Sequence, residues 1–184
     1  MRTKRNTVVL IVFALLAVAA LPARAAHSVP DNAEVRGVVQ RIFQQLKSGD
    51  YDALYDTLPT AQQRRVSRER FTRSLGRTRD LYELDRLEIG AVRTSGDLAV
   101  VDTVMYGRVL RPVQSEGKIV VQQYLVREDG TWRVATGDRA TVQTFLAANP
   151  TFARKFPLQK PRIYIKRDGR WVDVSSLKMP RRTT

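Results

Sequence analysis

The stretch VRGVVQRIFQQL at residues 35–46 decides the fold of this chain. Its apolar residues recur at the three- and four-residue spacing of one helical face, formed by Val35, Val38, Val39, Ile42, Phe43 and Leu46. We expect a helix of about four turns here, with Asp31 and Asn32 as candidate N-cap residues and Gly49 just past its C-terminal end. A helix with so continuous an apolar face needs a second layer to pack against.

Two shorter helical stretches follow this helix. Asp50 is suited to cap a helix over 51–58 that Pro59 ends, because its carboxylate can accept the unpaired amide hydrogens of the first turn. A third stretch covers about 60–79 and either runs on or restarts at Ser67.

The pattern then changes to the alternation typical of β-strands. We expect strands at 87–92, 98–110, 118–127, 131–134, 161–165 and 170–174, with one helix at 141–148 between them. The Asp-Gly pairs at 129–130 and 168–169 predict two hairpin turns of type I′. Helices followed by an antiparallel sheet predict an α+β fold, with N-terminal helices on one face of a curved sheet and an extra C-terminal β-hairpin.

The N-terminal segment has the three parts of a secretory signal peptide. A basic start precedes the apolar run 8–21, and Pro22 and the small-residue sequence Ala23-Arg24-Ala25 follow. As a helix the run reaches only about 21 Å, short of the ~30 Å hydrocarbon core of a bilayer. We therefore predict a signal peptide at 1–25, cleaved near Ala25, and a periplasmic or secreted protein; the alternative is an N-terminal membrane anchor.

Composition narrows the chemistry that this chain can perform. It has 184 residues, no cysteine and one histidine, His27, so a disulfide scaffold, a thiol nucleophile and a Cys-ligated metal are excluded. The formal charge is +14, concentrated in the arginine-rich segment 64–80 and in the chain after Arg154. Such segments attract anionic partners, although an arginine-rich solvated surface has the same composition. For an exported chain, nucleic acid is the least expected partner.

The chain is expected to form one main domain at 31–148. Residues 149–177 form a C-terminal extension whose β-hairpin packs on that domain, and 178–184 form a disordered tail.

Three motifs give the chain its resemblance to a known family. They are Gly-Asp-Tyr-Asp-Ala-Leu-Tyr at 49–55, Ser-Arg-Glu-Arg-Phe at 67–71 and Asp-Gly-Thr-Trp at 129–132. In this order, from about Val35 to Val134, they resemble exported bacterial-type members of the nuclear transport factor 2-like superfamily. The resemblance implies a conical α+β domain with a pocket between the sheet and the helices. The family includes isomerases, dehydratases, hydrolases and domains without catalysis, so the motifs indicate a fold and no reaction.

Asp102 is the one acidic residue in the middle of a long apolar strand. Buried among aliphatic side chains, it would have a raised pKa and could act as a general base. On a half-buried face it would instead pair with an arginine on a neighbouring strand. His27 lies too close to the predicted cleavage site to serve as a catalytic base, and scattered carboxylates alone predict neither a metal site nor a cofactor.

Four residues are candidates to line a ligand pocket: Tyr106, Gln122, Tyr124 and Trp132. They offer hydrogen bonds and aromatic surface, but such residues also close the wide end of a sheet or lie on its outer face.

Three functions stay open from the sequence. The first is a non-catalytic domain that binds a small apolar or anionic ligand in its pocket, or an envelope protein or second copy through its sheet. The second is an acid–base isomerase or hydrolase that uses Asp102 and pocket tyrosines. The third is attachment of the basic C-terminal hairpin to anionic envelope surfaces.

Overall fold

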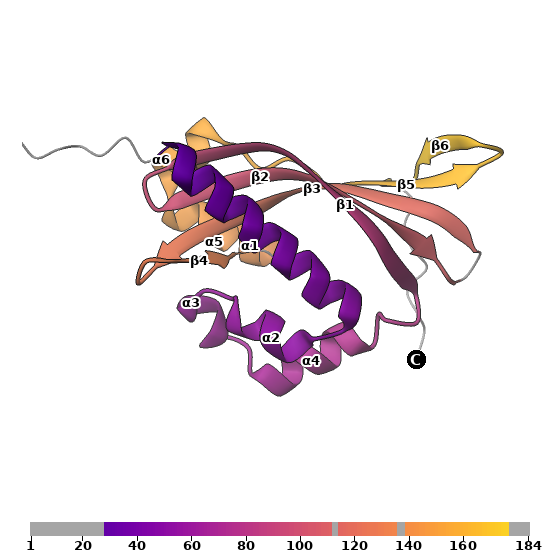
Figure 1. Ribbon diagram of the computed structural model, residues 1–184, viewed down its shortest axis with the longest axis horizontal. Helices are drawn as coiled ribbons and strands as arrows, with labels where there is room; N and C mark the ends of the chain where they lie inside the picture. Colours follow the sequence, from indigo (N-terminus) through magenta and orange to yellow (C-terminus); the bar gives the residue numbers. More distant parts are fainter. Residues whose placement is uncertain (1–27, 112–113, 136–138, 177–184) are drawn as a thin grey trace, which may run out of the picture.

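A computed structural model describes residues 28–111, 114–135 and 139–176 of the chain (Figure 1). The predicted signal peptide at 1–25, His27 and the predicted tail at 178–184 lie outside these residues. Within the described ranges, no helix combines the length and the apolar character needed to cross a bilayer.

Helix α1 spans Ser28–Ser48 and buries the face that the sequence predicts, with Val35 fully inaccessible to solvent. Gly49 follows it with a φ of 80°, the left-handed conformation that ends many helices. The predicted N-cap is wrong, because the helix begins at Ser28. Asp31 lies in the first turn and forms an ion pair with Arg127 of the sheet, so its carboxylate serves tertiary packing instead of a cap.

Three short helices continue the chain under α1. Helix α2 covers Tyr51–Asp56, and the Asp50 carboxylate caps it by accepting from the Ala53 amide at 3.2 Å. Helix α3 covers Thr60–Gln63 and α4 covers Arg68–Gly76. Ser67 accepts from the Arg70 amide at 3.3 Å, so the restart predicted at Ser67 is confirmed.

The sheet contains six antiparallel strands, all within the described residues. They are β1 (Tyr82–Ser95), β2 (Leu98–Val109), β3 (Ser115–Glu128), β4 (Thr131–Val134), β5 (Arg162–Arg167) and β6 (Arg170–Asp173). Positive φ at both Asp129 and Gly130, and at Asp168 and Gly169, confirms the two type I′ turns.

Strand β3 is the centre of the sheet. It pairs with β2 from Ser115 to Val126, and its other side pairs with β4 near its C-terminal end and with β5 near its N-terminal end. The C-terminal hairpin is therefore part of the main sheet and extends it to the order β1-β2-β3-β5-β6.

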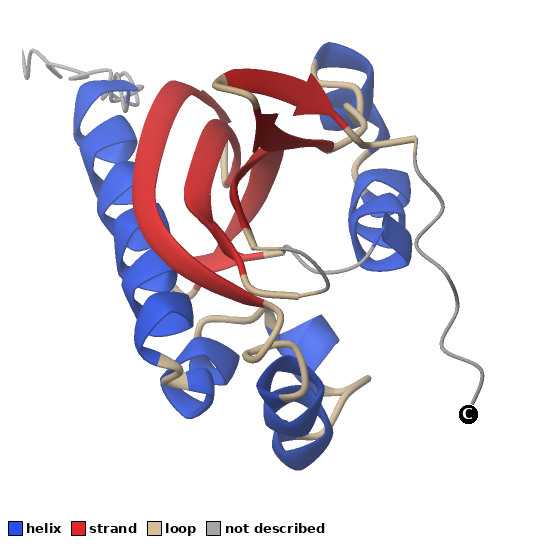
Figure 2. Ribbon diagram, turned by 90° about the vertical axis from the view of Figure 1, so that its right-hand side faces the viewer, coloured by secondary structure: helices blue, strands red, loops and turns tan. Residues whose placement is uncertain are grey.

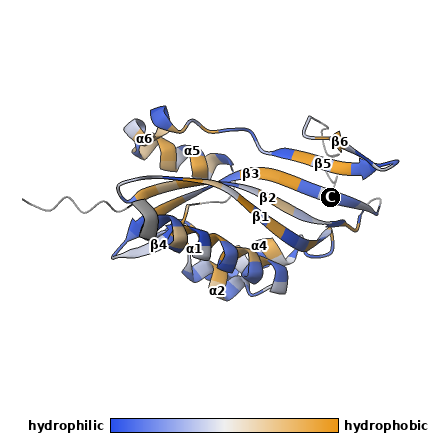
Figure 3. Cartoon of the chain, turned by 45° about the horizontal axis from the view of Figure 1, so that its top comes forward, coloured by the Kyte–Doolittle hydropathy of each residue, from blue (hydrophilic) through white to orange (hydrophobic). Residues whose placement is uncertain are grey.

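Helices cover both faces of this curved sheet (Figures 2 and 3). Helix α1 packs on the face that holds Ala99 and Val101, whereas α5 (Arg139–Ala148) and α6 (Pro150–Lys155) cover the opposite face at Val100 and Tyr124. The prediction of helices on one face only is incomplete, because both faces of β2 are apolar at this end. Helix α6 was not expected; Pro150 stands in its first turn, where a missing amide hydrogen costs nothing.

The free edge of β1 is occupied by cations from α1. Arg36 donates to the carbonyls of Ile89 and Gly90 at 3.1 and 2.7 Å, and Lys47 donates to the Asp85 carbonyl at 2.8 Å. These contacts satisfy acceptors that an exposed edge would offer to another strand, and they fix α1 along the sheet.

Gly107 marks a close approach of β1 and β2 that we expect to tolerate no side chain. A Cβ there would lie 2.3 Å from the Glu83 carbonyl oxygen. We expect Gly107→Ala to lower the free energy of unfolding by about 2 kcal/mol through overpacking. Gly37→Ala, on α1 with nothing within 4 Å, should raise it by about 0.5–1 kcal/mol. Denaturant unfolding of both variants tests this, and a neutral Gly107→Ala would contradict the close approach.

Candidate functional site

The candidate site is a cavity of about 180 Å³ between the N-terminal helices and the sheet, which we call the helix–sheet cavity. It lies where α1, α2 and α4 face the inner surface of strands β1 to β4. Twelve described residues line it: Val39, Ile42, Phe43, Leu46, Leu54, Leu58, Phe71, Leu75, Leu87, Met105, Gln123 and Val134.

The cavity follows from the lengths and angles of the helices. Helix α1 lies along the sheet, and its side chains from Val39 to Leu46 form one wall. Helices α2 and α4 lie beneath α1 and contribute Leu54, Phe71 and Leu75 from below. The cavity is the space that the side chains of these three helices and of the sheet leave unfilled.

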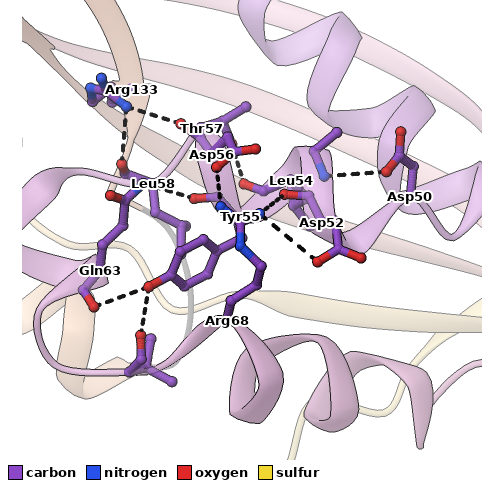
Figure 4. Close-up of polar contacts among 12 residues, drawn as sticks. Asp50, Asp52, Leu54, Tyr55, Asp56, Thr57, Leu58, Gln63, Arg68 and Arg133 are labelled. Atoms are coloured by element: carbon purple, nitrogen blue, oxygen red, sulfur yellow. Dashed lines mark hydrogen bonds and ion pairs between the residues drawn. The ribbon is translucent and has the colours of Figure 1, made fainter.

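A hydrogen-bond network holds α2 against the chain that leads into α4 (Figure 4). The Tyr55 hydroxyl lies 2.9 Å from the Val66 carbonyl and 3.1 Å from the Gln63 carbonyl, and the Gln63 amide donates back to the Tyr55 carbonyl at 3.0 Å. Phe71 of α4 packs edge-on against the Tyr55 ring, with centroids 5.7 Å apart. Phe71 of α4, which lines the cavity, is therefore held against α2.

Two arginines, one from α4 and one from β4, also hold α2 in place. Arg68 forms an ion pair with Asp56 and also donates to the Asp52 carbonyl at 2.9 Å. The hydrogen bond from Arg68 to the Asp56 carboxylate lowers the pKa of Asp56. Arg133 of β4 donates to the Asp56 carbonyl at 2.9 Å, and the Val134 amide donates to the Thr57 carbonyl at the same distance. Helix α2 is thus tied to the edge of the sheet as well as to α4 (Figure 4).

Gln123 is the one polar residue among the twelve that line the cavity. It lies on β3 directly opposite Val101 of β2, on the face that α1 covers. Within the described part of the chain, no group forms a hydrogen bond with its side-chain amide. An unpaired amide in an apolar cavity offers a donor and an acceptor to a bound molecule.

Asp102 lies on the opposite face of the sheet and is paired. Arg93 donates to its two carboxylate oxygens at 2.8 and 2.6 Å, and the Gln122 amide donates at 3.2 Å. The Arg93 hydrogen bonds hold the pKa of Asp102 below its usual range, and burial opposes them only in part. Of the two alternatives that the sequence leaves open for Asp102, pairing with an arginine of a neighbouring strand is confirmed and a raised pKa is not, because the strand turn at 96–97 brings Arg93 onto the same face.

The four candidate pocket residues do not converge on one site. Gln122 and Tyr124 lie together under α5 and α6, where the tyrosine hydroxyl donates to the Gln122 side-chain oxygen at 2.8 Å. Burial raises the pKa of Tyr124. Tyr106 lies farther along the same face and donates to Glu88 at 3.0 Å. Trp132 is 2% exposed on the α1 face, with the Arg127 guanidinium 4.5 Å above its ring.

Asp102 and Gln122 also line an open groove of about 990 Å³ beside the segment 159–162. Gln122 is 7% exposed and accepts from both Tyr124 and the Gln159 amide, so its carbonyl oxygen is already paired. The polar chain from Tyr124 through Gln122 to Asp102 and Arg93 is consequently satisfied within the protein and holds the 159–162 segment against the sheet.

Metal ligands do not cluster in the described residues: no three side chains among His, Cys, Asp and Glu lie close enough to hold an ion. The comparisons with known proteins add no assignment, since no protein-family model and no curated protein matches the chain.

Sequence reasoning missed Gln123 and found its neighbour Gln122. The two point to opposite faces of β3, and only the packing of α1 and α4 shows that the free cavity lies on the Gln123 face. Phe71 and Leu75 stand at helical spacing, which is typical of inward-facing residues but predicts no gap between them.

Replacement of Asp102 by asparagine tests its structural role. The lowered pKa means that the charged pair with Arg93 stabilises the fold above the unfolded-state pKa of about 3.9, and that this contribution is lost as pH falls through the folded-state pKa. We expect Asp102→Asn to cost about 0.5–1 kcal/mol at neutral pH, since both side chains are about one-third exposed or more. In acid-dependent unfolding the difference should vanish once the pH is below the lowered folded-state pKa of Asp102; a stabilised variant would contradict the pairing.

Proposed function

We propose that this protein is an exported, non-catalytic domain of the nuclear transport factor 2-like type that binds a small apolar ligand in the helix–sheet cavity. The observation that carries the proposal is the cavity itself, in which eleven of the twelve lining residues are apolar and Gln123 supplies one amide. Ligand pockets commonly combine an apolar lining with a few polar groups that orient the ligand.

The size of the cavity limits the ligand. A dry apolar cavity of about 150 Å³ in another protein accepts benzene. A volume of about 180 Å³ therefore suits a single aromatic ring with a small substituent, or a short alkyl chain. A polar group on that ligand would find its partner at Gln123.

The arrangement of elements supports the family part of the proposal. The step from α1 to α2 at Gly49 and Asp50, the restart of α4 at Ser67 and the Asp-Gly-Thr-Trp hairpin all have the local geometry that the resemblance implies. The cavity lies between helices and sheet, where that family has its pocket.

The acid–base alternative has less support. A carboxylate that accepts three hydrogen bonds, two of them from a guanidinium, is a weaker base than a free one. Asp102 is also on the face of the sheet opposite to the helix–sheet cavity, so it cannot act on a molecule bound there.

Binding of toluene tests the proposal directly. We expect toluene to raise the midpoint of thermal unfolding and to shift the NMR signals of the methyl groups that line the cavity, because a ligand that binds only the folded state stabilises it. Val39→Leu and Leu75→Phe should each weaken binding by about tenfold or more, since each fills part of the cavity.

Val142→Leu is the matched control for these variants. Val142 is buried like Val39, with 6% and 3% of their surfaces exposed, but it packs in the cluster on the opposite face. If Val142→Leu weakens toluene binding as much as Val39→Leu does, or if no methyl group of the cavity shifts, the ligand does not bind in this cavity.

Gln123→Leu tests the polar group of the site. Phenol and toluene have similar shapes, and only the phenol hydroxyl can pair with the Gln123 amide. We expect the variant to change the ratio of their dissociation constants by about tenfold in favour of toluene, the value of one hydrogen bond. Gln122→Leu, one residue away on the other face, should leave the ratio unchanged in the same titrations.

A further inference from the structure

The C-terminal hairpin β5–β6 extends the sheet away from the helices (Figure 1). Strand β6 is the last of the sheet and pairs with β5 alone. Three of the five large apolar side chains that are exposed in the described residues belong to this hairpin: Ile163 at 40%, Val172 at 39% and Trp171 at 36%. So much exposed apolar surface on a short hairpin indicates an interaction surface.

The two faces of the hairpin differ in chemistry. Strand alternation and the pairing of Ile165 with Val172 and of Arg167 with Arg170 place five side chains on one face, which we call the aliphatic face. It consists of Ile163, Ile165, Arg167, Arg170 and Val172. On this face the aliphatic side chains lie nearer the main sheet, and the two arginines lie at the tip of the hairpin.

The lysines of the opposite face already contact other groups of the protein. Lys166 forms an ion pair with Glu116 at 3.0 Å, and Lys118 lies 4.7 Å from the centre of the Trp171 ring. Tyr106 packs edge-on against the same ring, with centroids 6.3 Å apart. This face is occupied by contacts within the protein.

The arginines of the aliphatic face have no such contacts. Arg167 and Arg170 are both exposed and lie directly opposite each other, and no carboxylate of the described residues forms an ion pair with either. Asp168 occupies the turn between them and takes no part in an ion pair there. Two like charges in register destabilise a strand pair, and an anion bound between them would relieve that repulsion.

The aliphatic face is also continuous with the helix–sheet cavity. The strand register places Leu87, Met105, Ile119 and Ile163 in one row across β1, β2, β3 and β5. Leu87 and Met105 line the cavity, whereas Ile163 is exposed at the other end of the row. An apolar surface thus leads from the cavity to the hairpin.

We propose that the aliphatic face of the β5–β6 hairpin binds the surface of a membrane that contains anionic phospholipids. Arg167 and Arg170 contact the lipid phosphates, and Ile163 and Val172 enter the boundary between headgroups and acyl chains. Basic side chains and apolar surface on one face are the combination by which peripheral elements bind such membranes. The proposal does not depend on the ligand of the cavity, because vesicle binding is measured without one.

The test uses the chain from Ala26 onward, so that the apolar run at 8–21 cannot bind lipid itself. This form keeps every core side chain of the described residues, of which Val35 is the first. Vesicles of equal parts phosphatidylcholine and phosphatidylglycerol are compared with phosphatidylcholine alone. Cosedimentation measures binding, because Trp171 lies on the opposite face of the hairpin, packed against Lys118 and Tyr106. We expect sedimentation with the anionic vesicles only, weakened by salt.

Paired charge reversals identify the surface. Arg167→Glu with Arg170→Glu should weaken binding by about 30-fold or more, from the loss of two basic side chains at an anionic surface. Arg64→Glu with Arg65→Glu makes the same change in net charge at exposed positions outside the hairpin and should weaken it far less. Val172→Ser should weaken binding with unchanged salt dependence, because it removes apolar contact alone.

Several results would overturn the proposal. Equal loss in the two double variants would mean attraction by net charge without a defined face. Binding to soluble polyphosphate but not to vesicles would assign the arginines to an acidic polymer. Self-association abolished by Val172→Ser, with no vesicle binding, would assign the aliphatic face to a second copy of the chain.

Discussion

The docking of α1 on the sheet is the interaction on which the rest of the structure depends. Five of its apolar side chains are buried, from Val35 to Phe43, and each contributes about 1.5–3 kcal/mol. Their sum is comparable to the whole net stability of a typical domain, about 5–15 kcal/mol. Contacts from Asp31, Arg36 and Lys47 to the sheet then set the position of the helix along it, and with it one wall of the helix–sheet cavity.

Local chemistry made most of the elements predictable, because it operates within a few residues. The apolar period of α1, the cap at Asp50, the restart at Ser67 and the Asp-Gly turns each depend on a short stretch of chain. The start of α1 was misplaced because the Asp31 carboxylate has a partner 96 residues away, in Arg127. The second helical layer was missed for a similar reason: β2 is apolar on both faces, but its sequence does not show what covers the second one.

The candidate site was less predictable than the fold, since it depends on where packing leaves space. Asp102 and Arg93 are only nine residues apart in the sequence, and an arginine partner for Asp102 was one of the two alternatives that the sequence offered. The cavity instead requires the relative angles of α1, α2 and α4, which no local pattern contains. Adjacent glutamines on β3 were equivalent in sequence, and only the position of the cavity, on the face that α1 covers, distinguishes Gln123 from Gln122.

Cavity size and hairpin chemistry together restrict the role that this domain can have at a membrane. A space of about 180 Å³ is close in size to one that accepts benzene, so the helix–sheet cavity matches a small apolar molecule better than a whole phospholipid. A membrane is nevertheless where small apolar molecules concentrate, because they leave water for hydrocarbon. The apolar row from Ile163 to Met105 connects the hairpin, which we propose lies at the membrane, with the cavity. The two proposals are thus compatible in a domain that samples small apolar molecules at an anionic surface, with the lipid acting as the solvent of the ligand.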